Sequence, residues 1–182
     1  MKKLNLIFVF VIGMMAFTAK AQVDFKWNKV DSVSKSKSQI YSDTKMFIAQ
    51  YWKSAHDVIQ NDDKENGNVL IKGNTKQIID YCMVTYTYYN NYTVTFLMKD
   101  NKFKLILDNV NCSSTVAPSN AKYTIPCIPP FEGESYPDVP NWANLSKKKQ
   151  RELMFNLKHE LQLIVDNYTK YIKTPSVITK EW

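Results

Sequence analysis

The stretch DDKENGNVLIKG, residues 62–73, has the acidic start and central glycine of a calcium-binding loop. An EF-hand loop needs oxygen ligands at positions 1, 3 and 5, glycine at position 6 and a bidentate glutamate at position 12. With Gly67 at position 6, positions 1 and 5 fit, but position 3 is Lys64 and position 12 is Gly73. Because the bidentate carboxylate is missing, the sequence predicts a β-hairpin here instead, with Asn66-Gly67 supplying the positive φ angles of a tight turn.

Other residue types that often carry catalysis or bind metals are thinly spread. His56 and His159 lie far apart, and neither belongs to an H-E-x-x-H spacing. No G-x-S-x-G, Walker or G-x-G-x-x-G motif occurs. Carboxylate pairs for hydrolysis need no local motif, and the pair that stands out is Glu132 with Glu134 in a proline-rich segment. The sequence therefore predicts no catalytic, cofactor-binding or metal-binding residue, and it leaves a hydrolase with Asp or Glu residues as the alternative.

The N-terminus has the pattern of a secretory signal peptide. Two lysines precede an apolar run over residues 4–17, and residues 19–21 (AKA) form an A-x-A cleavage site. The run is shorter than the roughly 18–20 apolar residues that a membrane-spanning helix needs. We expect cleavage between Ala21 and Gln22, and a mature chain that is periplasmic or secreted and has no membrane span.

Size and charge limit what the mature chain can be. Residues 22–182 number 161, the size of one domain. Loss of three lysines with the signal peptide leaves 21 of the 24 basic residues against 17 acidic ones, a net charge of +4. This mildly basic balance favours solubility but lacks the concentrated positive charge of a nucleic-acid-binding domain. We therefore expect no nucleic-acid partner.

Two amphipathic helices are expected, one near each end of the mature chain. A strand over residues 23–30, in which apolar and polar residues alternate, comes first. Ser36 and Gln39 then form a capping box, which marks the start of a helix over residues 37–54. The last element is a helix over about residues 146–173, and residues at helical spacing form its predicted buried stripe: Leu153, Leu157, Leu161, Ile164, Tyr168 and Ile172.

Three long β-strands are predicted between these helices, over residues 77–89, 92–99 and 102–110, with turns at 90–91 and 100–101.

The apolar residues of these strands predict how they pair. In the second hairpin, Lys99 is expected to face Lys102, and in the first, Tyr88 is expected to face Tyr92. All the apolar rows then fall on one face, as in a half-buried antiparallel sheet. The other face is mixed in character, and we expect it to bind a ligand or partner through Tyr81, Thr85, Thr87, Thr93, Thr95, Lys104, Ile106 and Asp108.

One disulfide is predicted, because the chain is expected to be exported and has three cysteines. The predicted pairing puts Cys82 in a buried apolar row opposite Met98. At about 3.3 Å per residue, this row is roughly 30 Å from Cys112, far beyond bridging distance. Cys112 and Cys127 flank an irregular, proline-rich loop and can meet. We therefore predict a Cys112–Cys127 bridge and a buried free thiol at Cys82.

The order of these elements resembles one known family. The motifs that carry the resemblance are DKENG at residues 63–67 and Lys99-Asp100 followed by Phe103. They are similar to the exported bacterial family catalogued as domain of unknown function 4468, over about residues 34–112, although that family more often has Gly-Arg-Tyr at residues 101–103. The resemblance implies an α+β fold like that of the TATA-binding protein, a curved antiparallel sheet with two helices packed on one face. It implies no activity and no cofactor.

The fold name invites a DNA-binding interpretation, which the residues argue against. A minor-groove saddle needs a basic sheet face with apolar wedges. The predicted free face carries threonines, an aspartate and few lysines instead.

The sequence thus predicts a signal peptide over residues 1–21 and one domain over residues 22–173. That domain consists of a core over about 34–112, a connector over about 113–143 and the C-terminal helix, and a tail follows over 174–182. The expected function is a non-enzymatic binding module of the cell envelope, with an envelope protein or small ligand as its partner. The alternative is a hydrolase of an envelope polymer, and the oligomeric state is left open.

Overall fold

A computed structural model describes residues 26–52, 54–116, 121–125 and 146–175. The central element is a six-stranded antiparallel sheet with the order β1-β5-β4-β3-β2, and β6 pairs with the far end of β5. The strands are β1 (Lys26–Ser32), β2 (Ile59–Asp63), β3 (Asn68–Tyr81), β4 (Val84–Lys99), β5 (Lys102–Val116) and β6 (Ala121–Ile125).

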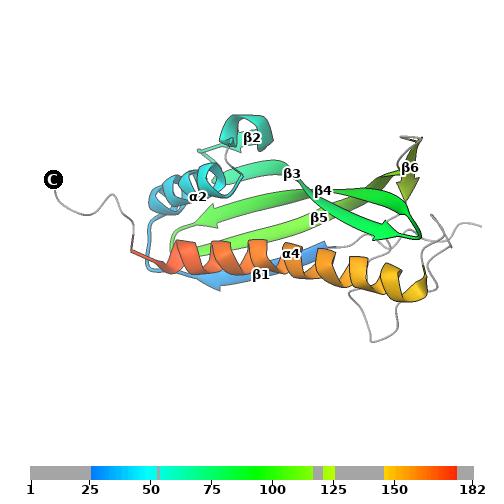
Figure 1. Ribbon diagram of the computed structural model, residues 1–182. Helices are drawn as coiled ribbons and strands as arrows, with labels where there is room; N and C mark the ends of the chain where they lie inside the picture. Colours follow the sequence, from blue (N-terminus) through cyan, green and yellow to red (C-terminus); the bar gives the residue numbers. More distant parts are fainter. Residues whose placement is uncertain (1–25, 53, 117–120, 126–145, 176–182) are drawn as a thin grey trace, which may run out of the picture.

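The helices α2 (Lys37–Tyr51) and α4 (Lys147–Lys173) pack against one face of this sheet, and a single turn, α3 (Ala55–Val58), leads into β2 (Figure 1). The predicted fold class, an α+β fold with two helices on one face of an antiparallel sheet, is therefore confirmed. We call the face that carries α2 and α4 the inner face.

Local sequence signals determine both long helices. The Ser36 side chain accepts a hydrogen bond from the backbone N–H of Gln39, and the Gln39 side chain accepts one from the backbone N–H of Ser36, so the predicted capping box is confirmed. The helix ends at Tyr51 instead of the predicted residue 54, and Trp52 is its C-cap. Every residue of the predicted α4 stripe is buried: Leu153, Leu157, Leu161, Ile164, Tyr168 and Ile172.

The second predicted hairpin has the predicted register. Lys99 pairs with Lys102, and the inward rows behind this turn, Phe96 with Leu105 and Val94 with Leu107, all contribute to the core. Beyond Thr93 a bulge at Asn109, which has φ 53°, shifts the pairing, and β5 continues past its predicted end at residue 110. The antiparallel ladder and the apolar alternation together determine this part of the sheet.

The first predicted hairpin is wrong, because its turn lies elsewhere. Residues 90–91 are in the middle of β4, where Asn91 pairs with both Asn74 and Asn111. The reversal occurs instead at Cys82 and Met83, whose φ angles of 50° and 63° are those of a two-residue primed turn. The strand passes through the two asparagines because the period-2 alternation of inward residues continues through them without a break.

Two predictions about Cys82 have opposite outcomes. Its thiol is free, as expected, but it is exposed, so the prediction that it is buried opposite Met98 is wrong. The reason is the position of the turn, which places Cys82 at the tip of a hairpin and pairs Met98 with Phe103 alone. Cys127 lies outside the described residues, so the Cys112–Cys127 bridge stays a prediction.

The β2–β3 hairpin over the DDKENG stretch is confirmed, but its turn differs from the prediction. Asp63 pairs with Asn68, so residues 64–67 form a four-residue loop and not a two-residue turn. Only Gly67 in this loop has a positive φ, 64°, and the Asp63 carboxylate accepts a hydrogen bond from the Asn66 backbone N–H at 3.0 Å. The carboxylate thus stabilises the loop backbone.

The connector is more regular at its start than predicted. Residues 113–116 continue β5, and Ala121–Ile125 form β6, which pairs with Cys112–Val116. This stretch contains Tyr123 and Ile125 in alternation and no proline, so a strand is compatible with it. Residues 126–143 of the predicted connector, the predicted cleavage site at Ala21 and Gln22, and residues 176–182 of the tail lie outside the described residues.

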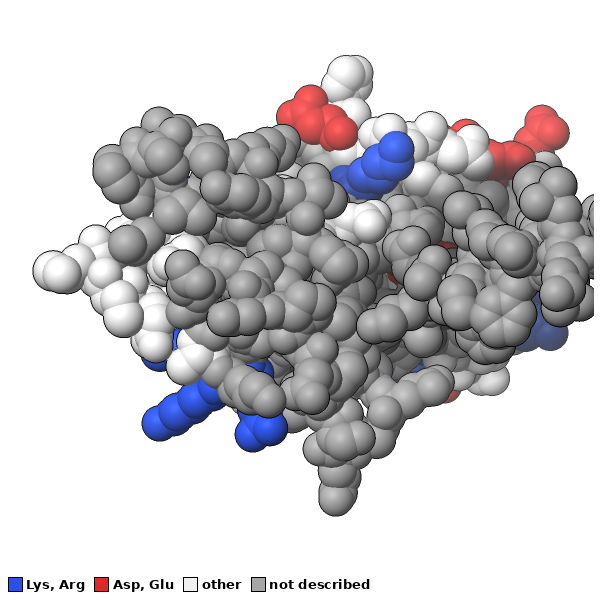
Figure 2. Space-filling view, turned by 90° about the vertical axis from the view of Figure 1, so that its right-hand side faces the viewer, with Lys and Arg blue, Asp and Glu red and all other residues white. Residues whose placement is uncertain are grey.

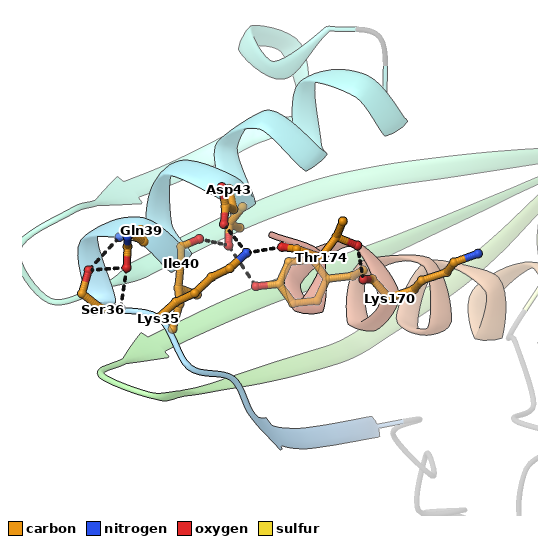
Figure 3. Close-up of polar contacts among 9 residues, drawn as sticks. Lys35, Ser36, Gln39, Ile40, Asp43, Lys170 and Thr174 are labelled. Atoms are coloured by element: carbon orange, nitrogen blue, oxygen red, sulfur yellow. Dashed lines mark hydrogen bonds and ion pairs between the residues drawn. The ribbon is translucent and has the colours of Figure 1, made fainter. Parts of the chain in front are cut away.

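A buried polar cluster fastens α4 to the start of α2 (Figure 3). The Lys35 ammonium donates to the Asp43 carboxylate at 2.7 Å and to the Thr174 backbone carbonyl at 2.6 Å. Both side chains of the ion pair are buried, with 9% and 6% of their surface exposed. We call this cluster the Lys35 clamp. It joins residues 139 positions apart and holds the C-terminal end of α4 on the inner face.

Candidate functional site

The face of the sheet opposite α2 and α4 is covered by neither helix, and we call it the open face. The register shows which side chains point to this face. Successive residues of a strand point to opposite faces, so these side chains are the direct chain neighbours of the buried inward residues. On the central strands they are hydroxyl, apolar and basic: Thr85, Thr87, Thr93, Thr95 and Leu97 of β4, and Lys102, Lys104, Ile106 and Asp108 of β5.

The structure places all of the predicted binding residues on this face except Tyr81. In β3 the inward rows are the odd-numbered residues, and Tyr81 accordingly packs against the core. Thr93 pairs with Asp108 and Thr95 with Ile106, so the centre of the predicted site is brought together. Thr93 is buried, whereas Thr95 and Ile106 are partly exposed.

The predicted residues do not form one compact site. Thr85 and Thr87 lie near the β3–β4 turn, because the chain does not reverse at residues 90–91. Thr85 is ten residues from Thr95 along one strand, which corresponds to about 33 Å. Its hydroxyl donates to the Asp80 carboxylate at 2.6 Å. Thr85 and Thr87 therefore belong to the opposite end of the open face from Lys104.

Sequence reasoning missed a depression at the β4–β5 hairpin end of the open face. Its volume is about 350 Å³, and we call it the lysine depression; it is lined by Val30, Asn66, Leu97, Met98, Lys99, Lys102, Phe103 and Lys104. The signal was present in the sequence, since residues 97, 99, 102 and 104 point to the same face across a two-residue turn. Val30 was missed because the first strand had no predicted partner, whereas β1 pairs with β5 and sets Val30 beside Lys104.

Two acidic residues that neighbour the lining residues along the chain are engaged elsewhere. Asp100, in the turn between Lys99 and Lys102, accepts a hydrogen bond from the Lys37 backbone N–H at 2.7 Å and so caps α2. Asp31 of β1 contacts the Lys173 ammonium at 2.7 Å, and this hydrogen bond lowers the pKa of its carboxyl group. Within the described part of the chain, Lys99, Lys102 and Lys104 form no ion pair.

The described carboxyl groups with shifted pKa values do not have the raised pKa that a general acid needs. Among the described residues, each aspartate with a shifted pKa has it lowered: Asp31, Asp57, Asp62 and Asp63. For Asp62, burial works against the hydrogen bonds from Lys45 and Tyr41, and the hydrogen bonds prevail. His56 and His159 are exposed on separate helices, and the described residues contain no cluster of potential metal ligands. Glu132 and Glu134 lie outside the described residues.

A second depression, of about 360 Å³, lies between the C-terminal ends of α2 and α4. Phe47, Tyr51 and Tyr171 line it, but these rings pack on one another, with Phe47 5.4 Å from Tyr51 and 5.5 Å from Tyr171 between centroids. The Phe47 side chain is buried and belongs to the core. We therefore assign this depression to helix packing.

Comparison with known proteins agrees with this architecture. Residues 27–113 match the family model described as domain of unknown function DUF4468 with TBP-like fold, which confirms the resemblance over that stretch. A TBP-like protein from Parabacteroides distasonis ATCC 8503 superposes with a TM-score of 0.58 at 11% identity, over 84% of this chain and 95% of that one. A DUF4468 family protein from Bacteroides ovatus ATCC 8483 superposes with a TM-score of 0.52 at 14% identity, over 85% and 89%.

At these identities the likeness to solved structures shows the fold alone. A search of the curated proteins found no match. Among the described helices, none has the length and apolar character needed to cross a bilayer.

Proposed function

We propose that the chain is a non-enzymatic, exported binding module, and that its open face binds an envelope protein or a small ligand. The observation that supports this proposal is the lack of a described helix over a face that carries partly exposed apolar side chains. Val30 is 62% exposed, and Leu97 and Ile106 are partly exposed in the neighbouring strands. Exposed apolar groups beside polar ones are typical of interaction sites.

The alternative, hydrolysis by a pair of carboxyl groups, has less support. It would require two carboxyl groups that converge in a pocket, one of them with a raised pKa. The described carboxyl groups with shifted pKa values have them lowered by hydrogen bonds and ion pairs. Binding is therefore the function that the described geometry favours.

Charge placed in the middle of the open face tests this function. In the double variant Thr95→Lys with Ile106→Glu, a partner that fits the open face is expected to be lost, because burying new charges at an interface is costly. The measurement is native mass spectrometry of the chain isolated from the cells that produce it, in which the wild type is expected to carry an additional mass that denaturation removes. The matched control is Phe155→Lys with Leu163→Glu, which introduces the same charges on the exposed side of α4.

Loss of the additional mass from the control variant, and its retention by the open-face variant, would contradict the proposed function.

If the chain is exported, the isolated protein should have a defined mass and a defined number of free thiols. Its intact mass is expected to correspond to a chain that begins at Gln22 and lacks two hydrogens, as a Cys112–Cys127 bridge requires. An alkylating reagent is expected to label one thiol in the native protein, because Cys82 is free and exposed, and three after reduction. The Cys82→Ser variant, as a control, should take no label before reduction. A retained leader or three reactive thiols would contradict the export proposal.

A further inference from the structure

The β4–β5 hairpin end of the open face concentrates positive charge. Lys99 and Lys102 lie directly opposite each other in the ladder, and Lys104 follows Lys102 on the same face. Like charges in opposed positions of a sheet repel and lower its stability. In the described part of the chain, no acidic side chain forms an ion pair with these lysines. Asp100, which lies between Lys99 and Lys102 in sequence, instead accepts a hydrogen bond from the N-terminus of α2.

Apolar groups border the same charges. Lys104 lies between Val30 of β1 on one side and Leu97 of β4 on the other, so one row across the sheet reads apolar, basic, apolar. The depression of about 350 Å³ that these residues line is within the size range of small-ligand sites. A ligand here would meet three ammonium groups at the hairpin and an exposed aliphatic surface beside them.

The donor set indicates the kind of anion. The lining residues include three lysines and no arginine. Lysine acts as a compact point charge and imposes no bidentate geometry, so it binds carboxylate and phosphate groups alike. The pairing with Val30 and Leu97 adds a requirement for an apolar part attached to the anion.

We propose that the lysine depression binds a small anionic amphiphile, whose carboxylate or phosphate group lies between Lys99, Lys102 and Lys104 and whose alkyl part covers Val30 and Leu97. This assignment rests on the proposed function, because it names the ligand class for one end of the open face. At the opposite end of the molecule, where α4 begins, basic and acidic side chains are both visible among those coloured by type (Figure 2).

The test is a titration of the isotopically labelled chain with octanoate, octyl phosphate, octanol and inorganic phosphate, followed through the backbone amide signals. Octanoate or octyl phosphate is expected to shift the signals of Val30, Leu97 and residues 99–104. The comparison of these two distinguishes a carboxylate from a phosphate ligand. Octanol lacks the anionic group and inorganic phosphate lacks the alkyl part. Each is expected to bind at least about tenfold more weakly than the amphiphiles.

Reversing the charge of two lysines tests their role in binding the amphiphile. The double variant Lys99→Glu with Lys102→Glu is expected to weaken binding of the amphiphile about tenfold or more, because it replaces attraction by repulsion. The control is Lys72→Glu with Lys76→Glu, which makes the same change at two exposed outward residues of β3, away from the depression. The control is expected to bind like the wild type.

Several outcomes would overturn the inference. The first is that neither octanoate nor octyl phosphate binds. The second is that inorganic phosphate binds as tightly as octyl phosphate. The third is that the Lys99→Glu, Lys102→Glu variant binds the amphiphile with the affinity of the wild type. The proposed function is tested separately by its natural partner. If that partner is lost from the Thr95→Lys, Ile106→Glu variant but kept by the Lys99→Glu, Lys102→Glu variant, the open face binds it and the amphiphile assignment is wrong.

Discussion

Replacing Asp43 with alanine is expected to lower the free energy of unfolding by about 3–5 kcal/mol, because the change leaves a buried ammonium without its counter-charge. The Lys35 side chain is 9% exposed and donates to the Asp43 carboxylate at 2.7 Å. Without that carboxylate, the Thr174 carbonyl at 2.6 Å is its acceptor. Urea denaturation followed by far-ultraviolet circular dichroism measures the effect.

Two further variants show whether the loss comes from the unpaired charge. Asp31→Ala removes a carboxylate that also contacts the end of α4, through Lys173 at 2.7 Å, but that pair is largely solvated and should contribute at most about 1 kcal/mol. Replacing both partners, as in Lys35→Met with Asp43→Leu, is expected to recover much of the stability, since apolar pairs often substitute well for buried ion pairs. Equal losses in Asp43→Ala and Asp31→Ala would show that the Lys35 clamp is not a buried ion pair in solution.

Replacing Tyr168 with alanine is expected to cost about 3–5 kcal/mol of unfolding free energy, because its ring fills the centre of the core. Tyr168 has no exposed surface, and its ring centroid lies 4.7 Å from that of Phe96 and 5.2 Å from that of Phe103. The ring centroid of Phe47 in α2 also lies 5.2 Å from that of Tyr168. Because Tyr168 belongs to α4, this one side chain connects α4 to both the sheet and α2. Thermal and denaturant unfolding of the variant measure the loss.

The hydroxyl group of Tyr168 contributes much less than its ring. It lies 2.9 Å from the Thr44 hydroxyl, which itself donates to the Ile40 carbonyl at 2.7 Å, so Tyr168 is the donor. Burial raises the pKa of Tyr168 and keeps it protonated. Tyr168→Phe should therefore cost about 1 kcal/mol, the net contribution of one hydrogen bond. A loss in Tyr168→Phe as large as that in Tyr168→Ala would contradict this division.

Both interactions act on the inner face and leave the open face free. They hold the C-terminal part of α4 against the sheet, through Tyr168 and through the Lys35 clamp at the C-cap Thr174. The binding that we propose for the open face would need a rigid support, and the helices supply it on the other side of the sheet.

The parts of the fold that the sequence predicted are those with local signals. The capping box at Ser36 and Gln39, the α4 stripe and the hairpin at residues 100–101 each depend on residues that are close along the chain. Helix caps and amphipathic periods are properties of a few consecutive residues, so they survive folding unchanged.

The failures concern signals that tertiary pairing overrides. Asn90-Asn91 is a turn-forming pair in isolation, but it lies in a central strand that pairs on both sides, and the ladder decides its conformation. Cys82 and Met83 have no turn propensity in sequence, yet they form the turn because the flanking strands Asn68–Tyr81 and Val84–Lys99 align there. The prediction of a buried Cys82 failed with the register on which it depended.

The candidate site was predicted only where it depends on strands that are neighbours along the chain. Thr93, Thr95, Ile106 and Asp108 were placed together correctly because β4 and β5 were paired correctly near their hairpin. The position of Val30 could not be predicted, since it depends on β1 pairing with β5 from more than 70 residues away. The lysine side of the depression follows from the hairpin at residues 100–101, so its signal was present but was missed. The Lys35 clamp also joins distant segments, and no local pattern at Lys35 or Thr174 indicates it.

The most direct test of the central claim, that the chain binds through its open face, is photo-crosslinking in the cells that produce it. A photoreactive benzoylphenylalanine replaces Ile106 on the open face in one variant and Leu163 on the exposed side of α4 in the other. Irradiation is expected to give a covalent adduct, a ligand or a protein of defined mass, from the Ile106 position and none from the Leu163 position. An adduct from Leu163 with none from Ile106 would contradict the claim and place the binding surface on the helices.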